Sequence, residues 1–511
     1  MAENKAQSGK AQSAEKNFGA MDVAKNSGAF VAGRWIGKLL ALATVLLLAP
    51  YLLPELFGQY SLITAFLGFF LFLNDFGVYS FIVRDISRDE SNASHVLGTA
   101  FALKGVLSLA AISLAVLSAA LLAYPWEIVL LVAIYSLTIL IGGLGSVFGI
   151  VFNTELRVKY NVYTELIERI SYLAIALFVM YALPKEQAMF WLISGLVVSV
   201  LLSNIARYFF FRRLVSAKPQ FKFRPEINLP YWKRLLKQSW PFAFITLCIA
   251  IYGRIDIVML SKMVGESAVG YYSSGYRITD TLILIPTALM VSLFPIMSHY
   301  FSKNREKLAT THSLALKYLA MVMLPAAIGT TFLSDKILTF LYGTGFIGSE
   351  TGMFLSLSLL MWAVLFAFFN YVNSYTLNSM NLEKVGVAVL SCGIVVKVLL
   401  NLFFIPAYSY VGSAFATLAT EALVFAAFTA LVWKHLGWAK LGIFARPLAA
   451  SAVMLAFILL APVPELLAVV SIAALVYFVS LYALGAFTQQ DKGIIMGVLT
   501  GTGIAQRFLK K

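Results

Sequence analysis

Long apolar runs follow one another along the whole chain, separated by short polar connections. A bilayer core takes about 20 apolar residues per helix, and at that run length a helix is the spanning structure that satisfies every backbone group. The runs fall near residues 29–53, 57–83, 96–123, 127–152, 162–183, 188–211, 241–264, 271–297, 313–334, 353–378, 385–406, 410–433, 445–462 and 466–487. The pattern predicts an all-α polytopic membrane protein with about fourteen transmembrane helices.

Composition supports a membrane protein over a soluble one. The 511 residues are 60% hydrophobic and 12% charged, with a mean hydropathy of +0.85, whereas soluble domains are about 45–50% apolar and about 25% charged. The net charge of +15 is spread between apolar runs and forms no basic stripe of the kind that binds nucleic acid. We therefore expect no nucleic-acid partner. Cys248 and Cys392 lie inside apolar runs without ligands at metal spacing, so we also expect no metal site.

Lysine and arginine gather in alternate connections. With the N-terminus inside, 28 of the 39 cations fall in inner segments and three, Lys185, Lys262 and Lys336, fall outside. Cytoplasmic loops carry such an excess, so both termini are predicted to be cytoplasmic in a multi-pass cell-membrane protein. The first 27 residues are polar, with no short apolar core followed by a cleavage site, so the first run is expected to stay as an anchor.

The chain repeats itself with a shift of 212 residues. Lys25, Ser27 and Phe30 superpose on Lys237, Ser239 and Phe242, and the same shift carries Gly58, Tyr60 and Ser61 onto Gly270, Tyr272 and Ser273. Since the shift spans six helices, the halves have the same orientation in the membrane. The predicted organisation is a polar tail (1–28), a six-helix bundle (29–211), a basic linker (212–240), a second six-helix bundle (241–433), and two further helices with a tail (434–511).

Part of the basic linker has the pattern of an amphipathic helix. Residues 230–237, Pro-Tyr-Trp-Lys-Arg-Leu-Leu-Lys, combine cations with aromatic and aliphatic side chains, which is typical of helices on a membrane surface. The alternative is a solvated linker. Residues 141–146, Ile-Gly-Gly-Leu-Gly-Ser, predict a closely packed helix face.

Several stretches together resemble the multidrug/oligosaccharidyl-lipid/polysaccharide exporter superfamily, and within it the polysaccharide-export flippases. They are Asp-Phe-Gly at 75–77, Arg-Asp at 84–85, residues 235–242, Tyr-Gly-Arg-Ile-Asp at 252–256, residues 269–277, Leu-Phe-Pro at 293–295, Asn-Leu-Phe-Phe-Ile-Pro at 401–406 and Val-Gly-Ser-Ala-Phe-Ala-Thr at 411–417. The resemblance implies a MATE-like pair of six-helix bundles that open a central cavity to one side at a time, followed here by two extra helices. Drug exporters of this superfamily usually carry acids in their cavity-lining helices, whereas the first helix here carries Arg34 and Lys38, which favours an anionic substrate.

Ionisable groups inside a membrane cost about 2.5–3.5 kcal/mol each on insertion scales, so each one is a functional candidate. The cationic candidates for substrate binding are Arg34, Lys38, Lys104, Arg254, Arg277 and Lys397. The acids that would couple an ion or pair with these cations are Asp75, Asp256, Asp280 and Glu421. Snorkelling to the interface is the alternative for Arg34 and Lys38, and Arg277 and Asp280 are spaced to pair on their own helix.

The predicted function is translocation of a polyprenyl-(pyro)phosphate-linked oligosaccharide from the inner to the outer leaflet by alternating access, for cell-surface glycan assembly. Its expected partners are that lipid-linked substrate, membrane lipids and glycan-assembly enzymes. Alternatives are a cation-coupled multidrug antiporter and a membrane glycosyltransferase or polymerase. No Walker A motif is present, so we expect no ATP hydrolysis, and the glycine pattern at 343–348 follows a membrane helix rather than a strand, so we expect no dinucleotide cofactor. The chain is not expected to be an enzyme, because its longest outer loop, about 335–352, carries only Asp335 and Glu350 as acids.

The charge asymmetry generates a first prediction, on topology. Fluorescent-protein domains fused after Arg224 and after Lys511 should fluoresce, whereas alkaline phosphatase fused at the same positions should be inactive, because the inner segments hold most of the cations. Activity of matched alkaline phosphatase and fluorescent-protein fusions measures this. Labelling of either position by a membrane-impermeant reagent from outside would overturn the fourteen-helix topology.

Overall fold

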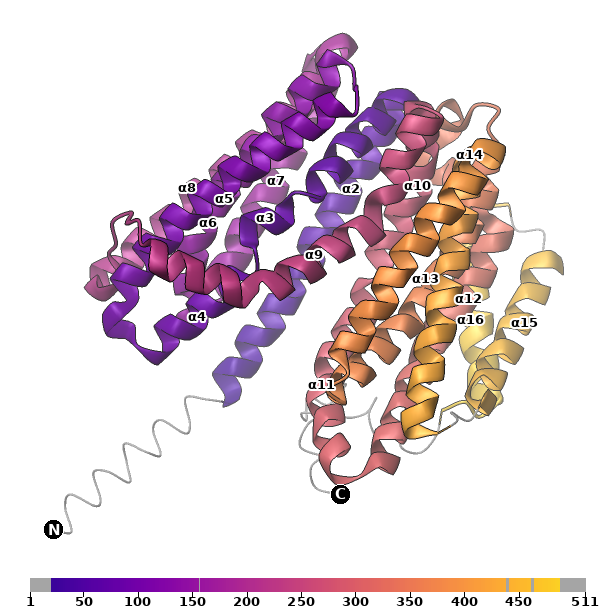
Figure 1. Ribbon diagram of the computed structural model, residues 1–511. Coiled ribbons are helices and arrows are strands. Elements are labelled where there is room, and N and C mark those ends of the chain that lie inside the picture. The colour runs from indigo at the N-terminus through magenta and orange to yellow at the C-terminus, as the bar shows by residue number, and fades with distance from the viewer. Residues whose placement is uncertain (1–19, 156, 438–440, 461–463, 488–511) are drawn as a thin grey trace. The chain divides into compact units, whose positions relative to one another are not determined.

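The computed structural model describes residues 20–155, 157–437, 441–460 and 464–487 (Figure 1). Within these ranges the chain is almost entirely helical and contains no strand. It divides into two compact units, residues 1–273 and 274–511. The predicted all-α fold is therefore confirmed, while residues 1–19 of the predicted polar tail and 488–511 of the predicted C-terminal tail lie outside the described residues.

The first unit is a bundle in which α6 lies at the centre, in contact with α2, α4, α5, α7 and α8. Its helices, of which Figure 1 labels the α-helices, are α2 (Ala20–Gly68), α3 (Leu71–Asp75), α4 (Val78–Arg88), η1 (Glu90–Asn92), α5 (Ala93–Leu121), α6 (Trp126–Thr154), α7 (Lys159–Ala182), α8 (Lys185–Ala217), η2 (Pro219–Phe221), α9 (Leu229–Met263) and the start of α10 (Glu266–Leu282).

The second unit begins within α10 and contains α11 (Leu284–Lys303), α12 (Arg305–Ile347), α13 (Gly352–Ser379), α14 (Glu383–Leu436), η3 (Leu441–Phe444), α15 (Ala445–Leu460) and α16 (Leu466–Ala483). Helix α13 packs against α11, α12 and α14, whereas α15 and α16 pack on each other and on α12. An apolar groove runs between α12 and the α15–α16 pair, lined by side chains that include Met321, Pro325, Met454 and Tyr477.

Eleven helical stretches of the described chain are long and apolar enough to cross a membrane. Two of them are double, because α2 has a non-helical residue at Leu53 and α14 has one at Ser409. Both residues lie where the hydropathy pattern predicts a connection between neighbouring spans. The structure therefore supports the polytopic fold, with fourteen as an approximate number of spans.

The second predicted span, 57–83, is not one continuous helix, and here the sequence-based expectation is wrong. The chain ends α2 at Gly68 and then forms the short α3 and the separate α4. Phe76 (φ 46°) and Gly77 (φ 71°) between them have left-handed backbones, which glycine adopts readily and phenylalanine rarely does. A Cβ on Gly77 would lie only 2.7 Å from the Cβ of Phe242. The break therefore lets α9 pass close to the backbone.

Two glycines related by the 212-residue repeat make reciprocal close contacts. A Cβ on Gly58 of α2 would lie 1.8 Å from the carbonyl oxygen of Glu266, and one on Gly270 of α10 would lie 2.0 Å from that of Pro54. Gly58 and Gly270 are repeat partners, and so are Pro54 and Glu266. The two contacts are therefore equivalent and are related by a local two-fold rotation, as expected of repeats with the same orientation.

This crossing generates a second prediction. Gly58→Ala and Gly270→Ala should each destabilise the protein by about 1–3 kcal/mol or more, since an added methyl group forces two packed backbones apart. The measurement is thermal unfolding of the purified protein in detergent. Gly142→Ala is the matched control, because nothing lies within 4 Å of its Cβ position. Equal melting temperatures for the crossing variants and this control would contradict the close packing.

Candidate functional site

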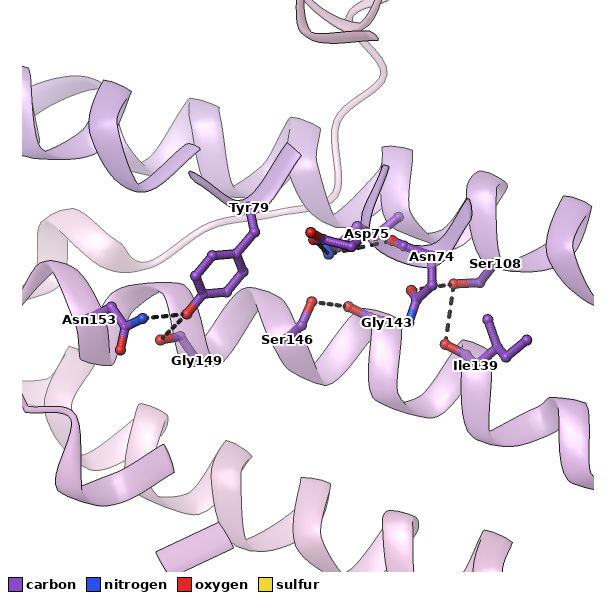
Figure 2. A network of polar contacts seen from close by, with 10 residues as sticks. Asn74, Asp75, Tyr79, Ser108, Ile139, Gly143, Ser146, Gly149 and Asn153 are labelled. Atoms are coloured by element: carbon purple, nitrogen blue, oxygen red, sulfur yellow. Dashed lines mark hydrogen bonds and ion pairs between the residues drawn. The ribbon is translucent and has the colours of Figure 1, made fainter. Parts of the chain in front are cut away.

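A buried lysine and a half-exposed aspartate meet at the break in the second span. Lys104 of α5 has a side chain that is 2% exposed, and its Nζ donates to Asp75 Oδ1 at 3.1 Å. Figure 2 shows Asp75 next to Asn74 at this break. The same ammonium group lies 3.5 Å from the carbonyl oxygen of Asn74, which the end of α3 leaves available. The Asp75 side chain is 51% exposed. Open space is therefore reached by the carboxylate, while the cation lies behind it.

Asn74 fixes the break to the neighbouring helices. Ser108 Oγ of α5 lies 3.3 Å from Asn74 Oδ1 and 3.3 Å from the carbonyl oxygen of Ile139 in α6, and it donates to one of them at a time. The Asn74 side chain fits because Gly143 has no Cβ, which would lie 2.3 Å from Asn74 Oδ1. Figure 2 shows these side chains in one row along α6. The short helix α3 is thus held from two sides.

The polar row continues along α6 beyond the break. Tyr79 Oη donates to the carbonyl oxygen of Gly149 at 3.4 Å and accepts from Asn153 Nδ2 at 2.7 Å (Figure 2). Asn161 Nδ2 of α7 then donates to Asn153 Oδ1 at 2.9 Å. The helices α4, α6 and α7 therefore share one hydrogen-bonded chain in the interior of the first unit, where each polar group needs a partner.

Arg207 ends this row and was missing from the residues predicted from sequence. Its Nη1 donates to Asn204 Oδ1 at 3.3 Å and its Nη2 to Thr164 Oγ1 at 3.2 Å. Sequence reasoning passed over it because it lies near a predicted span end, where snorkelling is the simplest interpretation. Gly145 of α6 is the sequence feature that points to this site. Its missing Cβ leaves room for Asn204, the residue to which Arg207 donates.

The other predicted residues of the first unit are spread over α2 and α9. Lys38 of α2 is exposed, whereas the side chain of Arg34 lies outside the described part of the structure. Arg254 of α9 is partly buried, and Asp256 is fully buried and accepts from Tyr272 Oη at 2.6 Å. This hydrogen bond gives Asp256 a structural partner. A shared anion site of Lys38 and Arg254 stays a prediction.

In the second unit, the predicted residues lie on α10 and α14. Arg277 and Asp280 are partly buried on α10, and Lys397 is buried on α14. Glu421, also on α14, accepts from Asn370 Nδ2 at 2.8 Å. Among the predicted cations and acids, an ion pair joins Lys104 to Asp75.

Lys317 is a second residue that sequence reasoning underestimated. We counted it among the inner-segment cations, but it is 8% exposed on α12. Ala102, Leu103 and Lys104 recur as Ala315, Leu316 and Lys317 with a shift of 213 residues, close to the repeat length. Lys104 and Lys317 are thus buried lysines at equivalent positions of the two halves.

The unequal burial of the ion pair generates a third prediction. Asp75→Asn should lower stability by about 1–3 kcal/mol, because it leaves a buried ammonium group without a counter-charge. Lys104→Met should lower it less, since the Asp75 carboxylate keeps contact with solvent. Thermal unfolding of both variants and of the double variant forms a cycle that isolates the interaction. Equal losses for the two single variants would show that burial does not set the asymmetry.

Comparison with known proteins identifies the family. The family described as polysaccharide biosynthesis protein matches residues 23–301, and the MatE family matches residues 241–403. The probable low-salt glycan biosynthesis flippase Agl15 of Haloferax volcanii is 25% identical over 418 residues, which are 80% of this chain and 83% of that protein. The lipid II flippase MurJ of Bacillus subtilis is 29% identical over 210 residues, and the chain spans only 38% of the length of that relative.

Solved structures show the same fold. The lipid II flippase MurJ in an inward closed conformation matches with a TM-score of 0.72 and 17% identity, over 90% of this chain and 99% of that one. An inward-facing MATE family transporter matches with a TM-score of 0.62 and 16% identity, over 78% and 95% of the two chains. The family match over more than half of the sequence, together with this fold, shows that the chain belongs to the polysaccharide biosynthesis protein family of the multidrug/oligosaccharidyl-lipid/polysaccharide exporter superfamily.

Proposed function

We propose that this protein is a flippase that moves a polyprenyl-phosphate- or pyrophosphate-linked oligosaccharide from the inner to the outer leaflet. The observation that carries the proposal is the relation to a probable glycan biosynthesis flippase over 80% of this chain and 83% of the relative. The same relation supports a transporter rather than an enzyme. The chain would then serve glycan assembly in the cell membrane, with assembly enzymes as its neighbours.

The buried cations suit an anionic headgroup. A phosphate accepts several hydrogen bonds from ammonium and guanidinium groups, and in a membrane interior these are stronger than in water. The ion pair of Lys104 and Asp75 has a further property: Asp75 neutralises the buried ammonium group, while its own side chain is half exposed. The carboxylate stands where a substrate phosphate would bind. Displacement of Asp75 by the phosphate would keep Lys104 neutralised through the transport cycle.

The membrane potential can supply the driving force. Moving one elementary charge across 100 mV is worth about 2.3 kcal/mol, so a headgroup with two negative charges gains roughly twice that amount on leaving an inside-negative cell. In this proposal both termini and the 212–240 linker are cytoplasmic, the bundles at 29–211 and 241–433 are the two repeats, and 434–511 is added to them.

The fourth prediction tests the substrate and the cationic residues together. Proteoliposomes that contain the protein should move a fluorescent polyprenyl-pyrophosphate sugar between leaflets and should not accumulate cationic dyes. Lys38→Ala, Arg254→Ala and Lys397→Ala should each slow the sugar lipid at least tenfold, because each removes one charge that the phosphate needs. Arg254→Lys should move the sugar lipid faster than Arg254→Ala but more slowly than the unchanged protein, because lysine lacks the bidentate geometry of the arginine guanidinium group.

The control is Lys303→Ala, which removes an exposed charge at the end of α11 and should leave the rate unchanged. Protein abundance in the membrane separates a binding role from a structural one, because loss of a purely structural charge lowers abundance instead. Normal abundance and normal rates in all three alanine variants would refute the cationic mechanism. Dye uptake driven by a cation gradient would instead support a drug antiporter.

A further inference from the structure

The segment that joins α8 to α9 is held tightly against the first unit. Phe221 is fully buried, Ser94 Oγ donates to the carbonyl oxygen of Lys222 at 2.6 Å, and the Glu226 amide donates to that of Gly98 at 3.2 Å. A Cβ on Gly98 would lie 2.1 Å from the carbonyl oxygen of Arg224. Because several of these contacts involve the backbone, the segment has a defined path and holds the start of α9 in place.

One face of the start of α9 completes this attachment. Asn228 caps the helix by accepting from the Tyr231 amide at 3.0 Å, and Trp232 Nε1 donates to the carbonyl oxygen of Thr99 at 3.0 Å. Leu235 and Ser239 on the same face have no exposed surface. Rotation of the first turns of α9 is therefore prevented, and their opposite face points away from the unit.

That opposite face, which we call the α9 surface, consists of Leu229, Lys233, Lys237 and Trp240. At 100° per residue these four positions fall within an arc of about 80°. Leu229 is 65% exposed and Trp240 is 57% exposed, and both lysines are exposed. Two cations four residues apart repel each other, and each has a large apolar side chain on its far side along the helix.

The position of the α9 surface in the chain places it at a membrane boundary. Helices α8 and α9 are both long and apolar enough to span the bilayer, so the segment between them lies at a membrane surface. Tryptophan concentrates at that depth, and lysine stems lie along apolar matter while the ammonium groups reach the phosphates. Pro241 follows directly and favours a bend between the surface part and the spanning part of α9.

We propose that the α9 surface binds the headgroups of anionic phospholipids. A phosphate diester with net negative charge between Lys233 and Lys237 removes their repulsion, while Leu229 and Trp240 enter the acyl boundary. Lys222 and Arg224 are exposed on the attached linker and add to the local positive charge. A zwitterionic headgroup supplies no net charge and would bind only through its apolar part.

Native mass spectrometry of the full-length protein, titrated with dioleoylphosphatidylglycerol and with dioleoylphosphatidylcholine, tests the proposal. Each lysine near a charged membrane surface contributes about a fivefold gain in affinity, so Lys233→Gln/Lys237→Gln should weaken phosphatidylglycerol binding by about 25-fold. Phosphatidylcholine binding should stay the same. The matched control is Lys303→Gln/Lys307→Gln, which removes two exposed lysines from the second unit. It should weaken phosphatidylglycerol binding less, because Lys303 ends α11 and Lys307 belongs to α12, so the two lysines do not share one helix face.

Two outcomes would overturn the proposal. In the first, Lys233→Gln/Lys237→Gln binds phosphatidylglycerol with unchanged affinity. The alternative occupant of the α9 surface would then be a protein partner. The other is an equal loss in the control variant, which would reduce the effect to net charge. The assay measures binding without transport, so its result is independent of whether the protein flips a lipid-linked sugar.

Discussion

The burial of a charged amine in a membrane bundle constrains much of the first unit. Lys104 cannot be hydrated where it lies, so a counter-charge has to reach it, and an unbroken second span would present only satisfied backbone groups there. The break after Asp75 supplies both a carboxylate and the Asn74 carbonyl oxygen. Phe76 and Gly77, whose backbones are left-handed, form this break and so allow the counter-charge to reach Lys104. An ion pair of this kind is worth little net stability by itself, but removing one partner is costly.

Glycines on α6 make this arrangement possible. Each of three positions that lack a Cβ accepts an asparagine from a different helix: Gly143 accepts Asn74, Gly145 accepts Asn204 and Gly149 accepts Asn161. The predicted close-packing face at 141–146 is therefore also where polar side chains enter the bundle. Close helix packing and buried asparagine side chains occur together here. A short amide side chain reaches a neighbouring backbone only where no Cβ intervenes, and it needs hydrogen-bond partners once it is buried.

Hydropathy predicted the spans well because run length and backbone satisfaction leave helices as the only solution in a bilayer. It missed the break at 74–77, because a window average over Leu-Phe-Leu-Asn-Asp-Phe-Gly-Val still reads as a span. Lys104 and Asp75 were both identified as costly charges, yet their pairing could not be predicted. They lie 29 residues apart on separate helices, and the geometry that joins them arises from the unpredicted break.

The repeat keeps the fold of the two halves while their chemistry diverges. Lys317 repeats Lys104 within the same Ala-Leu-Lys sequence, but the 212-residue shift carries Asp75 onto Thr287. The same shift carries Phe76 and Gly77 onto Ala288 and Leu289, which lie inside the continuous helix α11, so the second half does not reproduce the left-handed break. In the proposed flippase, two halves that share helix order handle one asymmetric substrate, and the ion pair of Lys104 and Asp75 in one half makes the halves inequivalent. The reciprocal contacts of Gly58 and Gly270 preserve the symmetric backbone crossing, so the asymmetry lies in side chains and in the local break.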